Sequence, residues 1–178
     1  MDTLTQYQSV IAACREIYLK KASDYGTSWR LLRSISIVDQ IYIKAWRIRQ
    51  IQELGNQEIE DSIENEFMGI VNYALIALIQ LASPDESHEL SPEEAAEKYD
   101  EQVATVRELM LRKNHDYGEA WRHMSQESFV DLILTKLLRI KQILANDGKT
   151  LISEGMDANF TDIINYAVFA LIKIQEKE

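Results

Sequence analysis

The chain has 178 residues, 46% of them hydrophobic, which is enough to bury the core of one compact domain or of two half-domains that share a core. Its net charge of -10 disfavours general nucleic-acid binding and binding to an anionic membrane surface, because both require a basic protein surface. The single cysteine, Cys14, excludes an intramolecular disulfide and suits a reducing cytoplasm. The first residues carry no secretory signal pattern, and the longest apolar run, residues 67–82, is interrupted by polar residues. We therefore expect a cytoplasmic protein that does not bind membranes.

Apolar residues at helical spacing, few glycines and prolines, and no alternating pattern predict an all-α chain. Ser91-Pro92-Glu93-Glu94 has the residues that start a helix, and Ser36-x-x-Asp39 and Ser128-x-x-Asp131 have the form of capping boxes. Both prolines lie in the polar stretch 83–92, which we interpret as a linker. The six principal helices are expected at residues 3–20, 36–54, 58–81, 92–113, 128–145 and 157–174.

One sequence pattern occurs twice, 92 residues apart. Asp24-Tyr25-Gly26 leads to Trp29-Arg30, and Asp116-Tyr117-Gly118 leads to Trp121-Arg122. The same offset relates Lys21 to Lys113, Ser36 to Ser128, Asp39 to Asp131, Lys44 to Lys136 and Arg47-Ile48 to Arg139-Ile140, and one inserted residue later Asn72-Tyr73-Ala74 matches Asn165-Tyr166-Ala167. The chain is therefore interpreted as a tandem duplication, with a first repeat at residues 1–82 and a second at 93–178. Because three helices cover a core poorly, we expect the halves to pack together as a pseudo-twofold bundle.

Basic residues interrupt the apolar stripe of the second helix in each half. Lys44 falls within this stripe and Arg47 lies at its edge, and Lys136 and Arg139 repeat the pattern. A lysine that points into a bundle is costly unless it is paired or binds an anion. These four residues are the candidate phosphate-binding residues.

The third helix of each half carries polar residues among apolar ones. Asn72 and Asn165 are the matching asparagines, and Asp162 lies one turn before Asn165. The first half has Gly69 at the position of Asp162, with Glu66 one turn further back. The asparagines could bind substrate, and Glu66 and Asp162 could hold Mg²⁺, which prefers oxygen ligands. The alternative is a Lys–Asp or Lys–Asn pair that fixes helix register without a ligand.

The repeated loops supply further candidates for substrate binding. Tyrosine and tryptophan can stack on a base, and arginine can form a forked contact with phosphate. The alternative is that the glycine ends a helix and the tryptophan packs in the core. The candidates are Asp24, Tyr25, Trp29 and Arg30, with Asp116, Tyr117, Trp121 and Arg122. The sequence has no glycine-rich phosphate loop, no Cys/His metal cluster and no Gly-x-Ser-x-Gly motif.

These loops, the Lys-x-x-Arg-Ile helices and the Asn-Tyr-Ala helices resemble the nucleotide modification associated domain 1 family, in two copies that cover nearly the whole chain. The resemblance implies a link to nucleotide metabolism or modified DNA bases. More remotely, the layout is similar to the all-α NTP pyrophosphatases of the MazG and dimeric dUTPase type, in which Glu-x-x-Glu and Glu-x-x-Asp pairs bind Mg²⁺. Lys44-x-x-Arg47 and Lys136-x-x-Arg139 stand where the first acidic pair would be sought. The second pair is reduced to Gly69-x-x-Asn72 and Asp162-x-x-Asn165, so a metal site of this kind would be degenerate.

Two hypotheses follow from the sequence. The first is a protein that binds or processes a nucleotide or another small phosphorylated ligand; as an enzyme it would be a Mg²⁺-dependent nucleoside phosphate hydrolase of the pyrophosphohydrolase type. The second is a non-catalytic helical module for interaction or oligomerisation, in which the repeated polar residues only set the packing. A homo-oligomer is compatible with both.

Overall fold

The computed structural model describes residues 2–84 and 89–177, and within these residues the chain is all-helical, as predicted. Residues 85–88 of the predicted linker, including His88, lie outside the described residues. The helices are α1 (Thr3–Tyr25), η1 (Ser28–Leu31), α2 (Ser34–Leu54), α3 (Ile63–Ala82), α4 (Pro92–Tyr117), η2 (Ala120–His123), α5 (Gln126–Ala145) and α6 (Met156–Lys177), where η marks a 3-10 helix.

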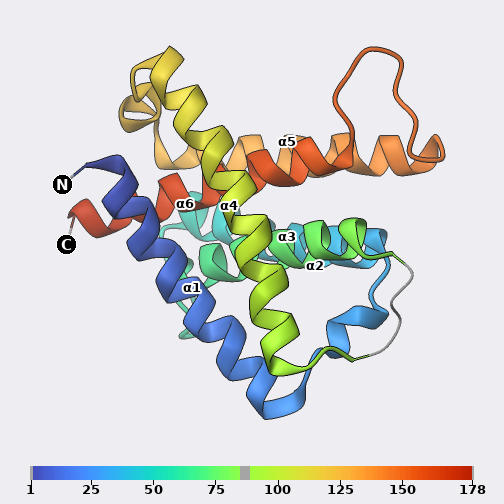
Figure 1. Ribbon diagram of the computed structural model, residues 1–178. Coiled ribbons are helices and arrows are strands. Elements are labelled where there is room, and N and C mark those ends of the chain that lie inside the picture. Colours follow the sequence, from blue (N-terminus) through green and yellow to red (C-terminus); the bar gives the residue numbers. More distant parts are fainter. Residues whose placement is uncertain (1, 85–88, 178) are drawn as a thin grey trace.

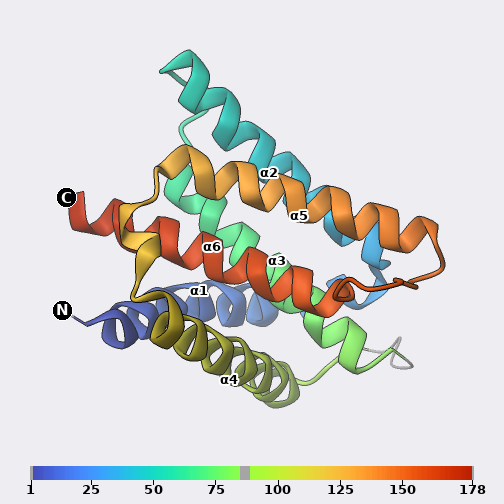
Figure 2. The same ribbon diagram turned by 90° about the horizontal axis from the view of Figure 1, so that it is seen from above.

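The six α-helices form three layers, and each layer pairs one helix from each half of the chain. Figure 2 shows α3 and α6 in the middle, with α2 and α5 on one side and α1 and α4 on the other. The first turn of α1 and the last turn of α6 lie at the same end of the bundle (Figure 1), where Gln6 donates a 2.9 Å hydrogen bond to Glu176. Helices from both parts of the chain therefore contribute to one hydrophobic core.

The middle position of α3 and α6 explains their composition. A helix with neighbours on both sides is apolar around most of its circumference, and nine buried apolar residues of α3 lie between Phe67 and Ile79, the last six of them consecutive. Among the described residues, α3 is the helix that is long and apolar enough to cross a membrane, and half of that stretch is buried inside the bundle. Packing against α2 and α6 accounts for its apolar side chains.

Reciprocal ion pairs join α2 and α5. Asp39, near the start of α2, lies 3.2 Å from Lys141, near the end of α5. Arg49, near the end of α2, lies 3.3 Å from Asp131, near the start of α5. Asp39 matches Asp131, and Arg49 matches Lys141, at the 92-residue offset. Each ion pair is therefore the counterpart of the other, which is the arrangement that a pseudo-twofold axis between α2 and α5 produces.

These ion pairs correct the capping boxes predicted at Ser36-x-x-Asp39 and Ser128-x-x-Asp131. The residue before α2 is Arg33 and the residue before α5 is Ser125, and neither makes a side-chain capping hydrogen bond. Both serines therefore lie inside the first turns, and the two aspartates bind across the helix pair instead of capping their own helices. The prediction was wrong because it considered only neighbours along the chain.

The other predicted helix boundaries are set by local chemistry. Ser91 forms the expected capping box, in which its hydroxyl accepts from the Glu94 amide at 3.1 Å and the Glu94 carboxylate accepts from the Ser91 amide at 3.3 Å. α1 and α4 continue through the Asp-Tyr dipeptides and end at Gly26 and Gly118, both with positive φ. They are thus longer than predicted, because the helix stop is the glycine.

Candidate functional site

In each half, the third helix anchors the Trp-Arg loop. Gln80 of α3 donates a 2.9 Å hydrogen bond to the Arg30 carbonyl, and its side-chain oxygen accepts one from the Arg30 guanidinium at 2.5 Å. Lys173 of α6, at the matching position, donates to the Arg122 carbonyl at 3.1 Å. η1 and η2 are therefore fixed to the core of their own half.

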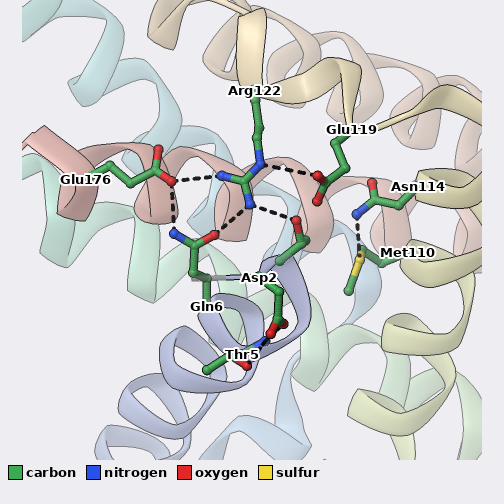
Figure 3. Close-up of polar contacts among 9 residues, drawn as sticks. Asp2, Thr5, Gln6, Met110, Asn114, Glu119, Arg122 and Glu176 are labelled. Carbon is green, nitrogen blue, oxygen red and sulfur yellow. Dashed lines mark hydrogen bonds and ion pairs between the residues drawn. The ribbon is translucent and has the colours of Figure 1, made fainter.

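The guanidinium of Arg122 is bound by the two ends of the chain rather than directed into a cavity. It donates to Gln6 at 2.7 Å and to Thr3 at 2.7 Å on α1, and to Glu176 on α6 at 2.8 Å. Figure 3 shows this group, with Glu119 on the opposite side of the guanidinium. Like Arg30, this arginine supports its loop, so neither guanidinium is placed as a direct phosphate ligand.

A cavity of about 470 Å³ opens in the first half between the end of α1, η1, α2 and α3. It brings together residues that the sequence had selected separately from the loop, the second helix and the third helix. These are Tyr25, Trp29, Lys44, Glu66 and Asn72. Lys21, which sequence reasoning noted as a repeated residue without assigning it to a site, lines the same cavity. The repeated Lys21–Lys113 match was the signal that could have identified it.

The basic residues in and beside this cavity, Lys21, Lys44 and Arg47, make at most long ion pairs with carboxylates. Lys44 lies 3.9 Å from Glu66, and Arg47 lies 3.6 Å from the same carboxylate oxygen. Within the part of the chain that the structure describes, Lys21 makes no hydrogen bond or ion pair. Gly69 lies below Lys44: a Cβ atom there would come within 2.9 Å of the Lys44 Cε atom, so the glycine leaves room for the lysine side chain.

In the second half, an aspartate takes the place of Gly69. Asp162 is buried, and its two carboxylate oxygens contact Lys113 at 3.0 Å and Lys136 at 2.9 Å. Desolvation opposes the charged form of Lys113, but the hydrogen bond and the charge of Asp162 outweigh it and raise the pKa of Lys113 above its ordinary value. In the second half, Lys113 and Lys136 are thus paired with a side chain of the protein. Their counterparts in the first half, Lys21 and Lys44, line a cavity instead.

Aromatic packing closes the second half further. Trp121 is buried and stacks on Phe169, with ring centroids 4.3 Å apart and ring planes 4° apart. The residue that matches Phe169 in the first half is Ile76, which lines the cavity together with Trp29. The smaller side chain at this position leaves space beneath the first tryptophan.

The two asparagines join the halves. Tyr7 of α1 donates a 2.8 Å hydrogen bond to Asn165, and its counterpart Tyr99 of α4 donates a 2.8 Å hydrogen bond to Asn72. The Asn72 amide group also donates to the Cys14 carbonyl at 2.9 Å. Each asparagine is therefore held by a tyrosine from the other half, and not by the lysine that the sequence alternative paired with it, and Asn72 also borders the cavity.

The connections after α2 and α5 differ. Arg47 donates to the carbonyls of Ile59 at 3.2 Å and Asp61 at 2.7 Å, which holds the α2–α3 connection against α2. Arg139, its counterpart, is exposed and lines, together with Lys136, a cavity of about 670 Å³ beneath the α5–α6 connection, residues 146–155. Figure 1 shows this connection extending away from the bundle.

The repeated aspartates and tyrosines lie toward the surface. Asp24 and Asp116 are both exposed, and Asp116 lies 3.0 Å from the ring of His115. Tyr25 is 58% exposed and Tyr117 is 73% exposed, and Tyr25 borders the first-half cavity. Of these four residues, Tyr25 is the one that lines the first-half cavity.

The proposed metal ligands are separated between the two halves, and each faces basic side chains. Glu66 lies near Lys44 and Arg47, and both oxygens of Asp162 are engaged by lysines. Over the described residues, no group of three or more His, Cys, Asp or Glu side chains could hold a metal ion. The donor set therefore does not fit a metal centre built by the protein alone.

The fold and site define an all-α protein made of two repeated halves that share a core, with an open cavity that has two lysines and aromatic walls in the first half. The chain belongs to the nucleotide modification associated domain 1 family, whose sequence model matches residues 21–81 and 113–174, together more than half of the chain. The two matched regions agree with the tandem duplication. No curated protein and no solved structure gives a significant match.

Proposed function

We propose that the first half binds a nucleotide, with a phosphate group at Lys21 and Lys44 and the base against Tyr25 and Trp29. The observation that carries this proposal is the convergence of the two lysines and two aromatic residues on one cavity of about 470 Å³. That volume falls in the range of small-molecule sites, roughly 300–1,000 Å³. The family description links the chain to nucleotide modification.

The chemistry of the lining supports a phosphorylated ligand. Lysine is a compact point charge that suits phosphate, and a tyrosine and a tryptophan at one edge offer faces on which a base can stack. Since the whole chain carries a charge of -10, the two lysines provide local attraction against the overall field.

The proposal concerns binding, and no hydrolytic step is derived. Asp61 and Glu66 are the carboxylates among the described residues that line the cavity, which is too few for the paired acidic motifs of the pyrophosphatase type. Magnesium stays a prediction, tested as an additive, because ligand phosphates could supply oxygens that the protein does not.

The experiment is a thermal-shift screen against nucleoside mono-, di- and triphosphates, with and without Mg²⁺, followed by calorimetric titration of the best ligand. A ligand that binds the native state raises Tm, and the shift grows with the logarithm of the ligand concentration relative to Kd. Lys44→Met should abolish the shift. The matched variant Lys136→Met should retain it, because Lys136 is already paired with Asp162 and does not line the first-half cavity.

Three results bear on this proposal. Binding that is lost in Lys44→Met and kept in Lys136→Met supports a site in the first half. Binding that survives Lys44→Met, or that is lost only in Lys136→Met, contradicts it. The absence of any shift in the wild type with ligand well above millimolar concentration also contradicts it.

One observation favours the second hypothesis, a helical interaction module. Large apolar side chains are exposed on the outer face of the α2–α5 layer, including Ile43 and Trp46 on α2 and Leu138 on α5. Trp46 and Leu138 occupy matching positions in the two halves, so a second copy of the chain could cover both. Light scattering of the wild type and of Trp46→Ser tests this. A concentration-dependent dimer that the substitution dissociates supports an interface, and a monomer at all concentrations excludes it.

A further inference from the structure

We propose that the Asp162 carboxylate marks the place that the anionic group of the ligand occupies in the first half. The second half is then a copy of this site in which the Asp162 side chain takes the place of the anion, and the cavity beneath the α5–α6 connection, which Lys136 also lines, is a different one. This inference rests on the proposed function for the nucleotide part of the ligand, while the anion position is argued from the comparison of the two halves. The equivalent positions are Lys21 and Lys113, Lys44 and Lys136, and Gly69 and Asp162.

The second half shows how the two lysines meet an anion. Lys113 approaches one oxygen of Asp162 at 3.0 Å and Lys136 approaches the other at 2.9 Å. Two ammonium groups thus share one two-oxygen anion across the gap between α4, α5 and α6. A phosphate group presents the same pair of acceptor oxygens and carries a larger charge, so it can take this position between Lys21 and Lys44.

In the first half, the space beside Gly69 is occupied by the end of the Lys44 side chain and not by an acidic group. A Cβ atom at Gly69 would meet the Cε, Cδ and Nζ atoms of Lys44 at 2.9–3.1 Å. These atoms are the far end of a flexible side chain, which can turn away when a ligand enters. In the matching place, the Lys136 side chain does lie beside an aspartate. The cavity is extended by Ile76, whose counterpart Phe169 fills the same region in the second half.

The charges of the lining limit how many phosphates fit. Lys21 and Lys44 are the basic residues that line the cavity, and Asp61 and Glu66 are the acidic ones. One phosphate between the lysines is neutralised, whereas further phosphates would approach the carboxylates without a cationic partner. In the absence of a divalent cation, the site should therefore prefer a nucleoside monophosphate over a triphosphate.

Exchanging the residues at positions 69 and 162 tests the assignment, with inorganic phosphate as the probe and chloride at matched ionic strength as the reference. Gly69→Asp places a carboxylate between Lys21 and Lys44. It should raise Tm by about 2–4 °C over Gly69→Asn, which fills the same space without charge. It should also abolish the response to phosphate.

Asp162→Gly makes the opposite change. Its Tm should be lower than that of the wild type in chloride and should rise more steeply with phosphate than the wild-type Tm, because Lys113 and Lys136 gain an external partner. Calorimetric titration should give about one phosphate per wild-type chain and about two per Asp162→Gly chain. Asp162→Asn, which removes the charge but fills the space, should not gain the second site.

Several results would overturn the inference. These are a wild type without a phosphate response, a Gly69→Asp variant that keeps the wild-type response, and an Asp162→Gly variant that responds no more than the wild type. If circular dichroism shows that Asp162→Gly is unfolded, the comparison of Gly69→Asp with Gly69→Asn decides alone. A response to acetate without a response to phosphate overturns the assignment of a phosphate group.

The two proposals fail separately. If the wild-type Tm responds to phosphate but to no nucleotide, the proposed nucleotide binding is wrong, whereas the proposed anion position is still supported. If Gly69→Asp binds a nucleotide as tightly as the wild type does, the proposed anion position is wrong and the nucleotide site lies elsewhere.

Discussion

The Tyr7 hydroxyl group donates a 2.8 Å hydrogen bond to the side-chain oxygen of Asn165, 158 residues further along the chain. Both side chains are buried, so the bond joins the first helix of one half to the last helix of the other inside the shared core. The reciprocal bond from Tyr99 reaches Asn72, which is only half-buried.

This difference predicts unequal costs for removing the two hydroxyl groups. Tyr7→Phe leaves a buried amide oxygen without its donor and should lower the free energy of unfolding by about 1–3 kcal/mol. Tyr99→Phe should cost less, because water can reach Asn72 from the cavity it borders. Urea unfolding of the three proteins measures both values. A larger loss for Tyr99→Phe would contradict the structural role assigned to the buried pair.

The two loop glycines should differ in their tolerance of a side chain. Gly26 has φ +73° and ψ -152°, and a Cβ there would lie 1.5 Å from a carboxylate oxygen of Glu89. Gly118 has a left-handed conformation, and a Cβ there would meet no atom within 4 Å.

Gly118→Ala should therefore cost about 1 kcal/mol for the backbone conformation alone. Gly26→Ala should cost more, because it adds displacement of Glu89 to a backbone conformation that only glycine adopts readily. Urea unfolding of the two variants side by side is the measurement. Equal losses would show that the contact with Glu89 carries no energy.

The pair between Lys113 and Asp162 predicts a loss of stability in alkaline solution. The pKa of Lys113 is raised in the folded protein, so its contribution is complete below the pKa of an unfolded lysine, about 10.4. It is then lost as the pH rises through the folded value. Asp162→Asn should weaken this dependence, since it removes the charge that raises the pKa.

The measurement is the free energy of unfolding of the wild type and Asp162→Asn between pH 8 and pH 11. Burial also raises the pKa of Tyr7, Tyr18 and Tyr99, but these residues are present in both proteins. The difference between the two curves therefore isolates the aspartate. We expect the difference in free energy of unfolding between the two proteins to become smaller above about pH 10. Parallel curves would contradict the pairing of Lys113 with Asp162.

Cys14 should be protected from thiol reagents in the folded protein. Its side chain is fully buried, and burial raises the pKa of its thiol to about 12. Because the thiolate is the reactive form, labelling at pH 8 should be slower in the native state than in urea by a factor of about 100 or more. Rapid labelling under native conditions would show that α1 opens locally; Cys14→Ser controls for nonspecific reaction.

Much of the fold was accessible from the sequence because it depends on local chemistry. The 92-residue offset between the Asp-Tyr-Gly patterns predicted the duplication, and Gly55 and Ser91 marked helix ends that the structure confirms. The predicted capping roles of Asp39 and Asp131 failed for the opposite reason. Their partners are the ends of helices that lie far away along the chain.

For the candidate site, the sequence by itself selected Lys44, its counterpart Lys136 and the paired aromatic loops, because polar or aromatic residues repeated at core or loop positions need a physical reason. Only the tertiary structure decided which half is open. That depends on where Asp162 and Phe169 place their side chains in space, on the room that Gly69 leaves for the Lys44 side chain, and on the smaller side chain of Ile76. A sequence repeat shows that two positions are equivalent, but it does not show which copy fills its own cavity.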